Sequence, residues 1–159
     1  IESTLDRTLQ FINRGHTYEE CVKTIQETAS RGIYTGANLI LGLPHESREE
    51  ILAHANKIAQ LPLTTIKLHQ LQLITGTVMA KKYKEHPEWC NLFTVDEYID
   101  LCIDFAERLN PSVVIERFIS QSPKNLLIAP DWGLKNFEFT AKIIKRFAER
   151  KTYQGRLFQ

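Results

Sequence analysis

The sequence predicts an α/β protein with parallel strands and outer helices, built as the C-terminal half of a TIM-type barrel. The short apolar run over residues 36–43, bounded by turns rich in glycine and proline, is typical of a strand covered on both faces in a parallel sheet. Helical patterns precede and follow this run, and strand and helix alternate to the end of the chain. Three full strands and a stub are too few to close a barrel of eight strands, so half of a barrel, or of an open one, is favoured.

The bulk properties limit the classes of function. A length of 159 residues suffices for one domain with a core, and a net charge of +1 gives no general attraction to nucleic acid or anionic lipid. No segment is expected to enter a membrane. Cys21, Cys90 and Cys102 form no C-x-x-C pair, so neither a zinc site nor a disulfide framework is indicated. Free thiols fit a cytoplasmic location.

The elements before and around the central strand follow from caps and spacing. Residues 4–12 carry apolar side chains at helical spacing. A capping box at residues 17–20 opens a second helix, which continues to about Gly32. After the strand, a box at residues 47–50 opens a helix that Pro62 ends.

The remaining elements continue the alternation. Residues 64–74 are predicted to form one strand and residues 77–86 a short helix. A third capping box, at residues 94–97, opens a helix to about Leu109, and residues 113–119 form the next strand.

The last part of the chain is expected to be simpler. Residues 120–132 are predicted to be a loop with one helical turn, and residues 137–150 a basic helix with a solvated face, followed by a loose tail. We divide the chain into the barrel half, 1–135, and the closing helix with its tail, 136–159.

Asn38 is the unusual residue of the central strand. A buried amide without a partner costs about 1–3 kcal/mol, so this one requires a reason. Alternation along the strand places Asn38 with Ile40 and Gly42 on one face, which is where we expect function. The alternative is an amide that pairs with a neighbouring strand.

Several segments in order resemble one enzyme family. They are Ile1-Glu-Ser3, Asn13-Arg-Gly-His16, Asn38-x-Ile40-x-Gly42-Leu-Pro-x-Glu46, and the strand from Lys67 to Ile74. Together they are similar to the radical S-adenosylmethionine (SAM) enzymes of the YhcC-type branch. The resemblance implies a partial (βα)6 barrel whose [4Fe-4S] cluster is held by a C-x-x-x-C-x-x-C loop. That signature is absent here, so we interpret the chain as a fragment, with the cluster cysteines upstream and no metal ligands of its own.

The resemblance also implies a set of SAM-binding residues. Glu2 and Ser3 match the end of the fourth strand, near SAM, and Arg14 matches the arginine that pairs with the SAM carboxylate. The remaining matches are Asn38 with the ribose hydroxyls, Ile40 with the adenine-contacting apolar position, and Leu71 with a backbone contact to adenine. From the residues alone, a helix-end arginine that binds carbonyls is the commoner interpretation of Arg14, and the family resemblance favours the ligand-binding role.

Three further side chains are candidates for the substrate cavity. Lys67 and His69 share a face with Leu71, which makes them candidates to line the cavity. The commoner role for such a histidine is structural, with its ring hydrogen-bonded inside the protein. Arg117, on the opposite face from Glu116, suits an anionic substrate group, and a salt bridge to a neighbouring acid is an equal reading. Glu46 is interpreted as a helix-start residue with a capping role.

The expected function is therefore that of a radical SAM oxidoreductase in the parent protein. The resemblance implies that an electron donor reduces the cluster, SAM is cleaved to a 5′-deoxyadenosyl radical, and hydrogen is abstracted from an unknown substrate, small molecule or macromolecule. The fragment alone is expected to be inactive, to bind no cofactor, and to dimerise through exposed sheet edges. Its catalytic residues are not assigned. The alternatives are an ordinary TIM-barrel or open α/β enzyme for an anionic metabolite, and a non-catalytic interaction module.

Overall fold

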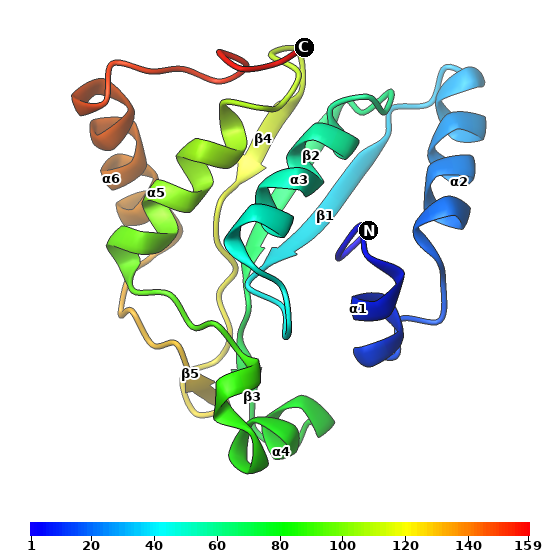
Figure 1. Cartoon of the computed structure of the whole chain (residues 1–159). Helices are drawn as coiled ribbons and strands as arrows, with labels where there is room; N and C mark the ends of the chain where they lie inside the picture. The colour runs from blue at the N-terminus through cyan, green and yellow to red at the C-terminus, as the bar shows by residue number, and fades with distance from the viewer.

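A parallel three-stranded sheet forms the centre of the structure, a computed structural model that describes residues 1–159 (Figure 1). Its strands are β1 (Gly36–Leu41), β2 (Thr65–Gln70) and β4 (Val114–Arg117), in the order β1-β2-β4. On the other side of β1, the Ile40 amide donates a hydrogen bond of 3.0 Å to the carbonyl of Glu2. The first residues therefore lie along β1, where the strand stub is expected. The parallel pairing of the three strands confirms the predicted α/β class.

Helices flank the sheet, and three of them begin where the sequence predicts. The three capping boxes are all present, each with a threonine or serine at the N-cap and a glutamate three residues later. The helices are α1 (Asp6–Phe11), α2 (Tyr18–Ser30), α3 (Arg48–Ile58), α4 (Val78–Glu85), α5 (Val95–Ala106) and α6 (Asn136–Glu149), with a 3-10 turn η1 (Pro87–Trp89).

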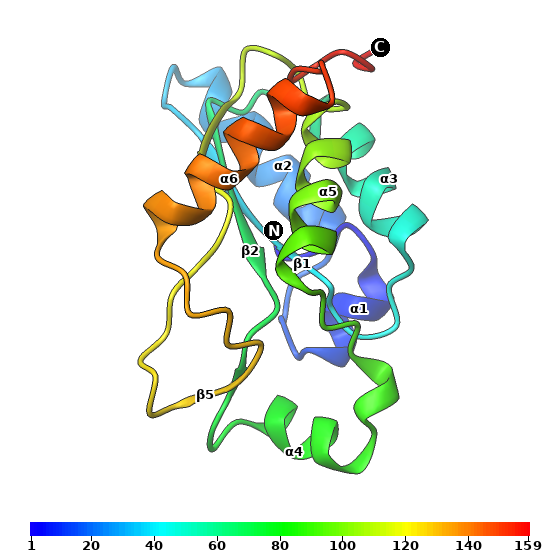
Figure 2. The same ribbon diagram turned by 90° about the vertical axis from the view of Figure 1, so that its left-hand side faces the viewer.

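The core lies on one face of the sheet only. Leu39, Leu41, Ile66 and Leu68 are fully buried against α3 and α5, and α6 packs beside α5 at the β4 side (Figures 1 and 2). The opposite face is open, because Asn38 on it is exposed. The prediction of a strand covered on both faces is therefore wrong for β1, and Asn38 is not a buried amide.

The single strand expected over residues 64–74 is in fact two. The side-chain amide of Gln70 exchanges hydrogen bonds of 3.0 and 2.9 Å with the backbone of Ser120, which ends the ladder between β2 and the chain after β4. The next strand, β3 (Leu73–Ile74), pairs antiparallel with β5 (Leu127–Ala129), inside the segment expected to be a loop. With α4 and η1, this pair forms a small lobe beyond the carboxyl ends of the parallel strands (Figures 1 and 2).

A bulge changes the expected faces of β4. Ile66 pairs with Ile115, but Lys67 pairs with Arg117, so the register skips Glu116. A bulge places two residues of one strand opposite one of the other. Both Glu116 and Arg117 consequently reach side chains on the open face, and the prediction that they point to opposite faces is wrong.

The C-terminal segment is packed rather than loose. The amides of Gly155 and Leu157 donate to carbonyls at the end of α5, and Arg156 forms an ion pair with Glu107 at 3.1 Å. In α6 itself, Phe139 and Ile143 belong to the main core. Helix and tail are thus integrated with the preceding residues.

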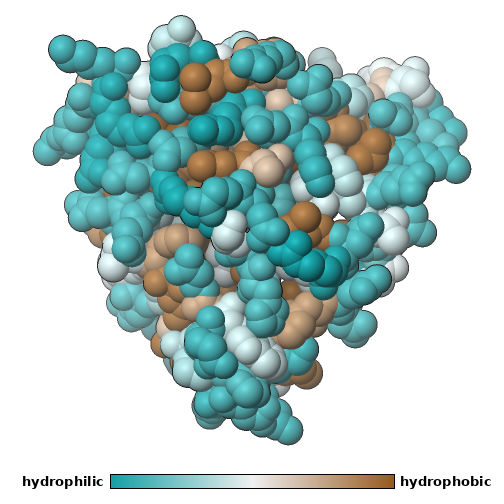
Figure 3. All heavy atoms as spheres, viewed as in Figure 1, coloured by the Kyte–Doolittle hydropathy of each residue, from teal (hydrophilic) through white to brown (hydrophobic).

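The helix-bearing side is largely hydrophilic, with apolar side chains separated by polar ones (Figure 3). None of the helices combines the length and the apolar character needed to cross a lipid bilayer.

Candidate functional site

The open face of the sheet carries a row of polar side chains from all three strands. Register places Asn38 of β1 beside Lys67 of β2, and Lys67 beside Arg117 of β4. One step further along, Ile40 pairs with His69. These residues lie in the carboxyl-terminal half of the strands, where ligands bind in α/β folds. The structure thus brings the β1 candidates and the three substrate-cavity candidates onto one surface.

Lys67 on this face has a counter-charge. Its Nζ lies 3.1 Å from the carboxylate of Glu116, a partner made available by the bulge. Hydrogen bonds from Thr65 and Lys67 lower the pKa of Glu116, so the carboxylate is charged at neutral pH. Lys67 and Glu116 therefore add no net charge to the surface.

His69 and Arg117 form the other contact on the open face. Nη2 of Arg117 lies 3.5 Å from Nε2 of His69. Burial, and then the positive charges of Arg117 and Lys67, lower the pKa of His69, which makes the ring neutral at pH 7. The salt bridge considered for Arg117 is not formed: no carboxylate lies within 4 Å of its guanidinium, and its Nε is buried without an acceptor.

Glu2 and Arg14 form a second polar group, next to β1. The Arg14 Nε donates to the Glu2 carboxylate, and this contact raises the pKa of Arg14. The carbonyl of Glu2 accepts from Ile40, so the pair is fastened to the strand that carries Asn38. The side chain of Arg14 bonds no helix-end carbonyl, which removes the alternative reading for it.

Ser3 has a different position from Glu2. It is fully buried, and its hydroxyl donates to Glu46 at 2.5 Å while it accepts from the Leu5 amide. Glu46 in turn lies 3.2 Å from Nε2 of buried His54, whose Nδ1 is 2.7 Å from the Thr4 hydroxyl. These contacts favour a structural role for Ser3.

The buried network of Ser3, Glu46 and His54 is not among the sequence-based predictions. Glu46 is 4% exposed and does not cap α3, because Ser47 is the N-cap. The available signal was His54, which falls on the apolar face of α3 with Ile51 and Ala55. A histidine at that position needs a buried partner, and Glu46 is the acid that precedes the helix.

Leu71 lies where β2 leaves the sheet. It is 7% exposed, packs against Leu43 and Leu73, and its amide donates to the Leu41 carbonyl. Above the end of β1, Gly42 has φ 93°, and a Cβ there would lie 2.9 Å from the Phe93 ring. Gly42 therefore provides a turn that another residue would strain, as expected for a structural Gly-Leu-Pro segment.

The cysteines lie in separate elements, and no group of three potential metal-binding side chains is found. Cys21 is on α2, Cys90 follows η1, and burial raises the pKa of the Cys102 thiol in α5. A protonated, isolated thiol is unsuited to iron. The residues present do not fit a [4Fe-4S] cluster.

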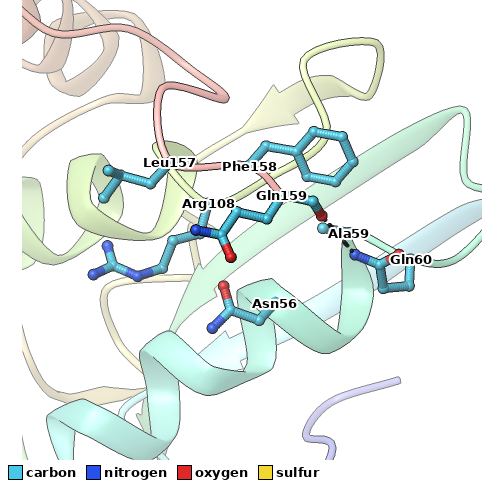
Figure 4. A pocket seen from close by; sticks show the side chains of 7 residues that line it. All are labelled: Asn56, Ala59, Gln60, Arg108, Leu157, Phe158 and Gln159. Carbon is cyan, nitrogen blue, oxygen red and sulfur yellow. Dashed lines mark hydrogen bonds between the residues drawn. The ribbon is translucent and has the colours of Figure 1, made fainter.

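A hollow also exists at the opposite end of the sheet (Figure 4). It is lined by Asn56 of α3, Gln60 just after α3, Arg108 after α5 and the tail residues. Gln60 donates to the Gln159 carbonyl at 3.2 Å. Gln60 and Arg108 precede β2 and β4, so this hollow lies at the amino ends of the strands. In barrel folds the active site lies at the carboxyl ends of the strands. We therefore do not assign the functional site to this hollow.

Known proteins resemble this chain over its whole length. The radical SAM C-terminal domain family matches residues 63–149. Protein YtqA of Bacillus subtilis is 31% identical over all of this chain and 49% of its own length, and protein YhcC of Escherichia coli K12 is 29% identical over 83% of this chain and 42% of its own. The structure of Elp3 from Methanocaldococcus infernus with an N-terminal deletion aligns over 96% of this chain and 35% of that one, with a TM-score of 0.83 and 17% identity.

The fold and the open polar face define a parallel α/β protein of the partial-barrel class. The chain belongs to the radical SAM superfamily and is of the YhcC type, as the sequence resemblance indicates. It spans about half the length of the curated relatives it matches.

Proposed function

We propose that this chain is the part of a radical SAM enzyme that holds the methionyl and ribose ends of SAM. The observation that carries the proposal is the Glu2–Arg14 pair, fastened through the Glu2 carbonyl to the strand of Asn38. In this family a reduced iron–sulfur cluster and SAM supply the radical chemistry; the cysteines of this chain do not fit that cluster.

The Glu2–Arg14 pair has the charges that an α-amino acid requires. The guanidinium of Arg14 presents further N–H groups for a carboxylate, and the carboxylate of Glu2 can accept from an ammonium group. Glu2 is 24% exposed and Arg14 36%, so both remain accessible to a ligand while they hold each other in place. A zwitterionic methionyl end therefore finds both of its charges matched.

Asn38 and Ile40 suit the nucleoside end. The Asn38 side chain is exposed and makes no hydrogen bond within the protein, so its donor and acceptor are free for a pair of hydroxyls. Ile40 is half-buried beside it on the same face and offers an apolar surface to a base. Leu71, with its amide already bonded, contributes through its carbonyl or its packing.

The test is titration of SAM into the full-length protein, measured by calorimetry. We expect Arg14→Gln to weaken binding about tenfold or more, because a charge-assisted hydrogen bond contributes about 1.5–3 kcal/mol. Asn38→Ala is expected to weaken it several-fold.

The matched control is Arg31→Gln, an equal change of charge at an exposed position after α2. It should leave SAM affinity unchanged. Unaltered affinity in Arg14→Gln, with the control behaving as expected, would return the chain to the alternatives of an ordinary α/β enzyme or an interaction module.

A further inference from the structure

Arg117 is a guanidinium without a counter-charge at the end of β4. Its side chain has five N–H donors, and the one contact it makes in the protein is the long one to His69, 3.5 Å. Its Nε is fully buried and meets no acceptor. Leaving a charged donor unsatisfied in a buried position is unfavourable.

The charged neighbours of Arg117 leave a net positive charge at this position. Glu116, the adjacent acid, is engaged by Lys67 at 3.1 Å, and Lys67 is the residue that pairs with Arg117 in the sheet. His69 is neutral and adds no negative charge. The side chains facing Arg117 thus amount to one cancelled ion pair and a neutral ring, which leaves a net positive charge at this position.

The site is also well placed relative to the proposed SAM site. Asn38 and Ile40 are on β1 and Arg117 is on β4, with β2 between them. Neighbouring strands are separated by about 4.8 Å, so the two positions are about 10 Å apart on the same face. A molecule bound at Arg117 would lie beside SAM rather than in its place.

We propose that Arg117 and His69 form a binding site for an anionic oxygen group, a carboxylate or a phosphate, of the substrate. Arginine holds both groups through two parallel hydrogen bonds, and the one N–H of the neutral His69 ring is available to donate a third. That the anion belongs to the substrate depends on the proposed function, whereas the binding of the anion does not.

The test is a titration of the ¹⁵N-labelled full-length protein with two probes, inorganic phosphate and acetate, at constant ionic strength. The Nε–Hε resonance of Arg117 and the ring resonances of His69 are followed by NMR. We expect saturable shifts of both with at least one probe, and the tighter probe identifies the anionic group. Arg117→Gln should weaken the His69 response about tenfold or more.

Two controls separate this result from other outcomes. Arg31→Gln removes an exposed arginine and should leave the titration unchanged. Arg14→Gln, which is expected to lose SAM, should still bind the anion, so failure of one proposal is distinguishable from failure of the other. Shifts that do not saturate, that occur equally at all arginines, or that persist in Arg117→Gln would overturn the site.

Discussion

At the scale of single residues, Glu46 shows how burial changes the role of a side chain. From its place before a helix, the simplest expectation is capping. The structure instead buries Glu46 between the Ser3 hydroxyl and His54. It thereby fixes the segment that carries Glu2 to the helix that follows β1.

Removing Glu46 should therefore destabilise the protein. We expect Glu46→Ala to lower the free energy of unfolding by about 2–4 kcal/mol, because two buried polar groups lose their partner. Urea denaturation measures the change. Glu27→Ala, at an exposed position of α2, should change stability by less than about 0.5 kcal/mol, and a similar value for both variants would contradict the assignment.

The candidate site was only partly accessible to sequence reasoning. Asn38 and Arg117 stand out as polar residues in apolar strands, and Lys67 and His69 as residues on the face of Leu71. The structure places all four on one face. Periodicity cannot show a bulge, so the availability of Glu116 to Lys67 was missed. The contact of Glu2 with Arg14 depends on tertiary structure and is not among the sequence-based predictions; the family resemblance implies only that each residue lies near SAM.

At the scale of elements, helix starts were predictable and strand ends were not. A capping box is local, since its residues are three apart, and all three were found at the expected positions. The end of β2 depends on a distant partner, because the Gln70 amide bonds Ser120 fifty residues away. Strand length therefore could not follow from the pattern of residues 64–74 alone.

The basic helix α6 is bound to the protein by ion pairs with α5. Arg150 contacts Asp104, which also pairs with Arg48 of α3, so one carboxylate joins three helices. Burial opposes ionisation of Asp104, but the hydrogen bonds from Arg150 and Arg48 outweigh it and lower its pKa. Arg150, at the end of α6, thus has an intramolecular partner, which indicates a structural role for this charge.

Asp104→Asn should lower stability by about 1 kcal/mol at neutral pH and low salt, since the pairs are partly solvated. A carboxylate with a lowered pKa stabilises the fold above its unfolded pKa, about 4, and loses this effect as pH falls through the folded value. The difference between wild type and variant should therefore shrink in acid and in high salt. Urea denaturation across pH and ionic strength measures it; a difference independent of both would point to packing instead.

At the scale of the whole molecule, the sheet has an open edge at β4. Val114 is 57% exposed there, and a groove lined by Val113, Phe118, Phe147 and Tyr153 lies beside it. Unpaired strand edges with apolar neighbours favour association. Dimerisation of the isolated chain through its sheet edges thus remains our expectation.

We expect Val114→Lys to weaken self-association of the 159-residue chain about tenfold or more, because a charge on an edge strand opposes pairing. Analytical ultracentrifugation over a range of concentrations measures the effect. The control is Val78→Lys on α4, where valine is 72% exposed and distant in sequence from the edge. Equal effects of both substitutions would indicate nonspecific aggregation.

The packed tail has a practical consequence for protein engineering. The Glu107 side chain is 4% exposed; it accepts from the Thr152 hydroxyl and pairs with the Arg156 guanidinium at 3.1 Å, whereas Arg150 lies farther away, at 4.0 Å. Its nearest partners are therefore in the last eight residues. Ending the chain before Thr152 would remove the two nearest partners of this buried carboxylate. It would also remove the amides that bind the carbonyls of Ala106 and Glu107. Shortened expression variants should therefore retain residues through Leu157.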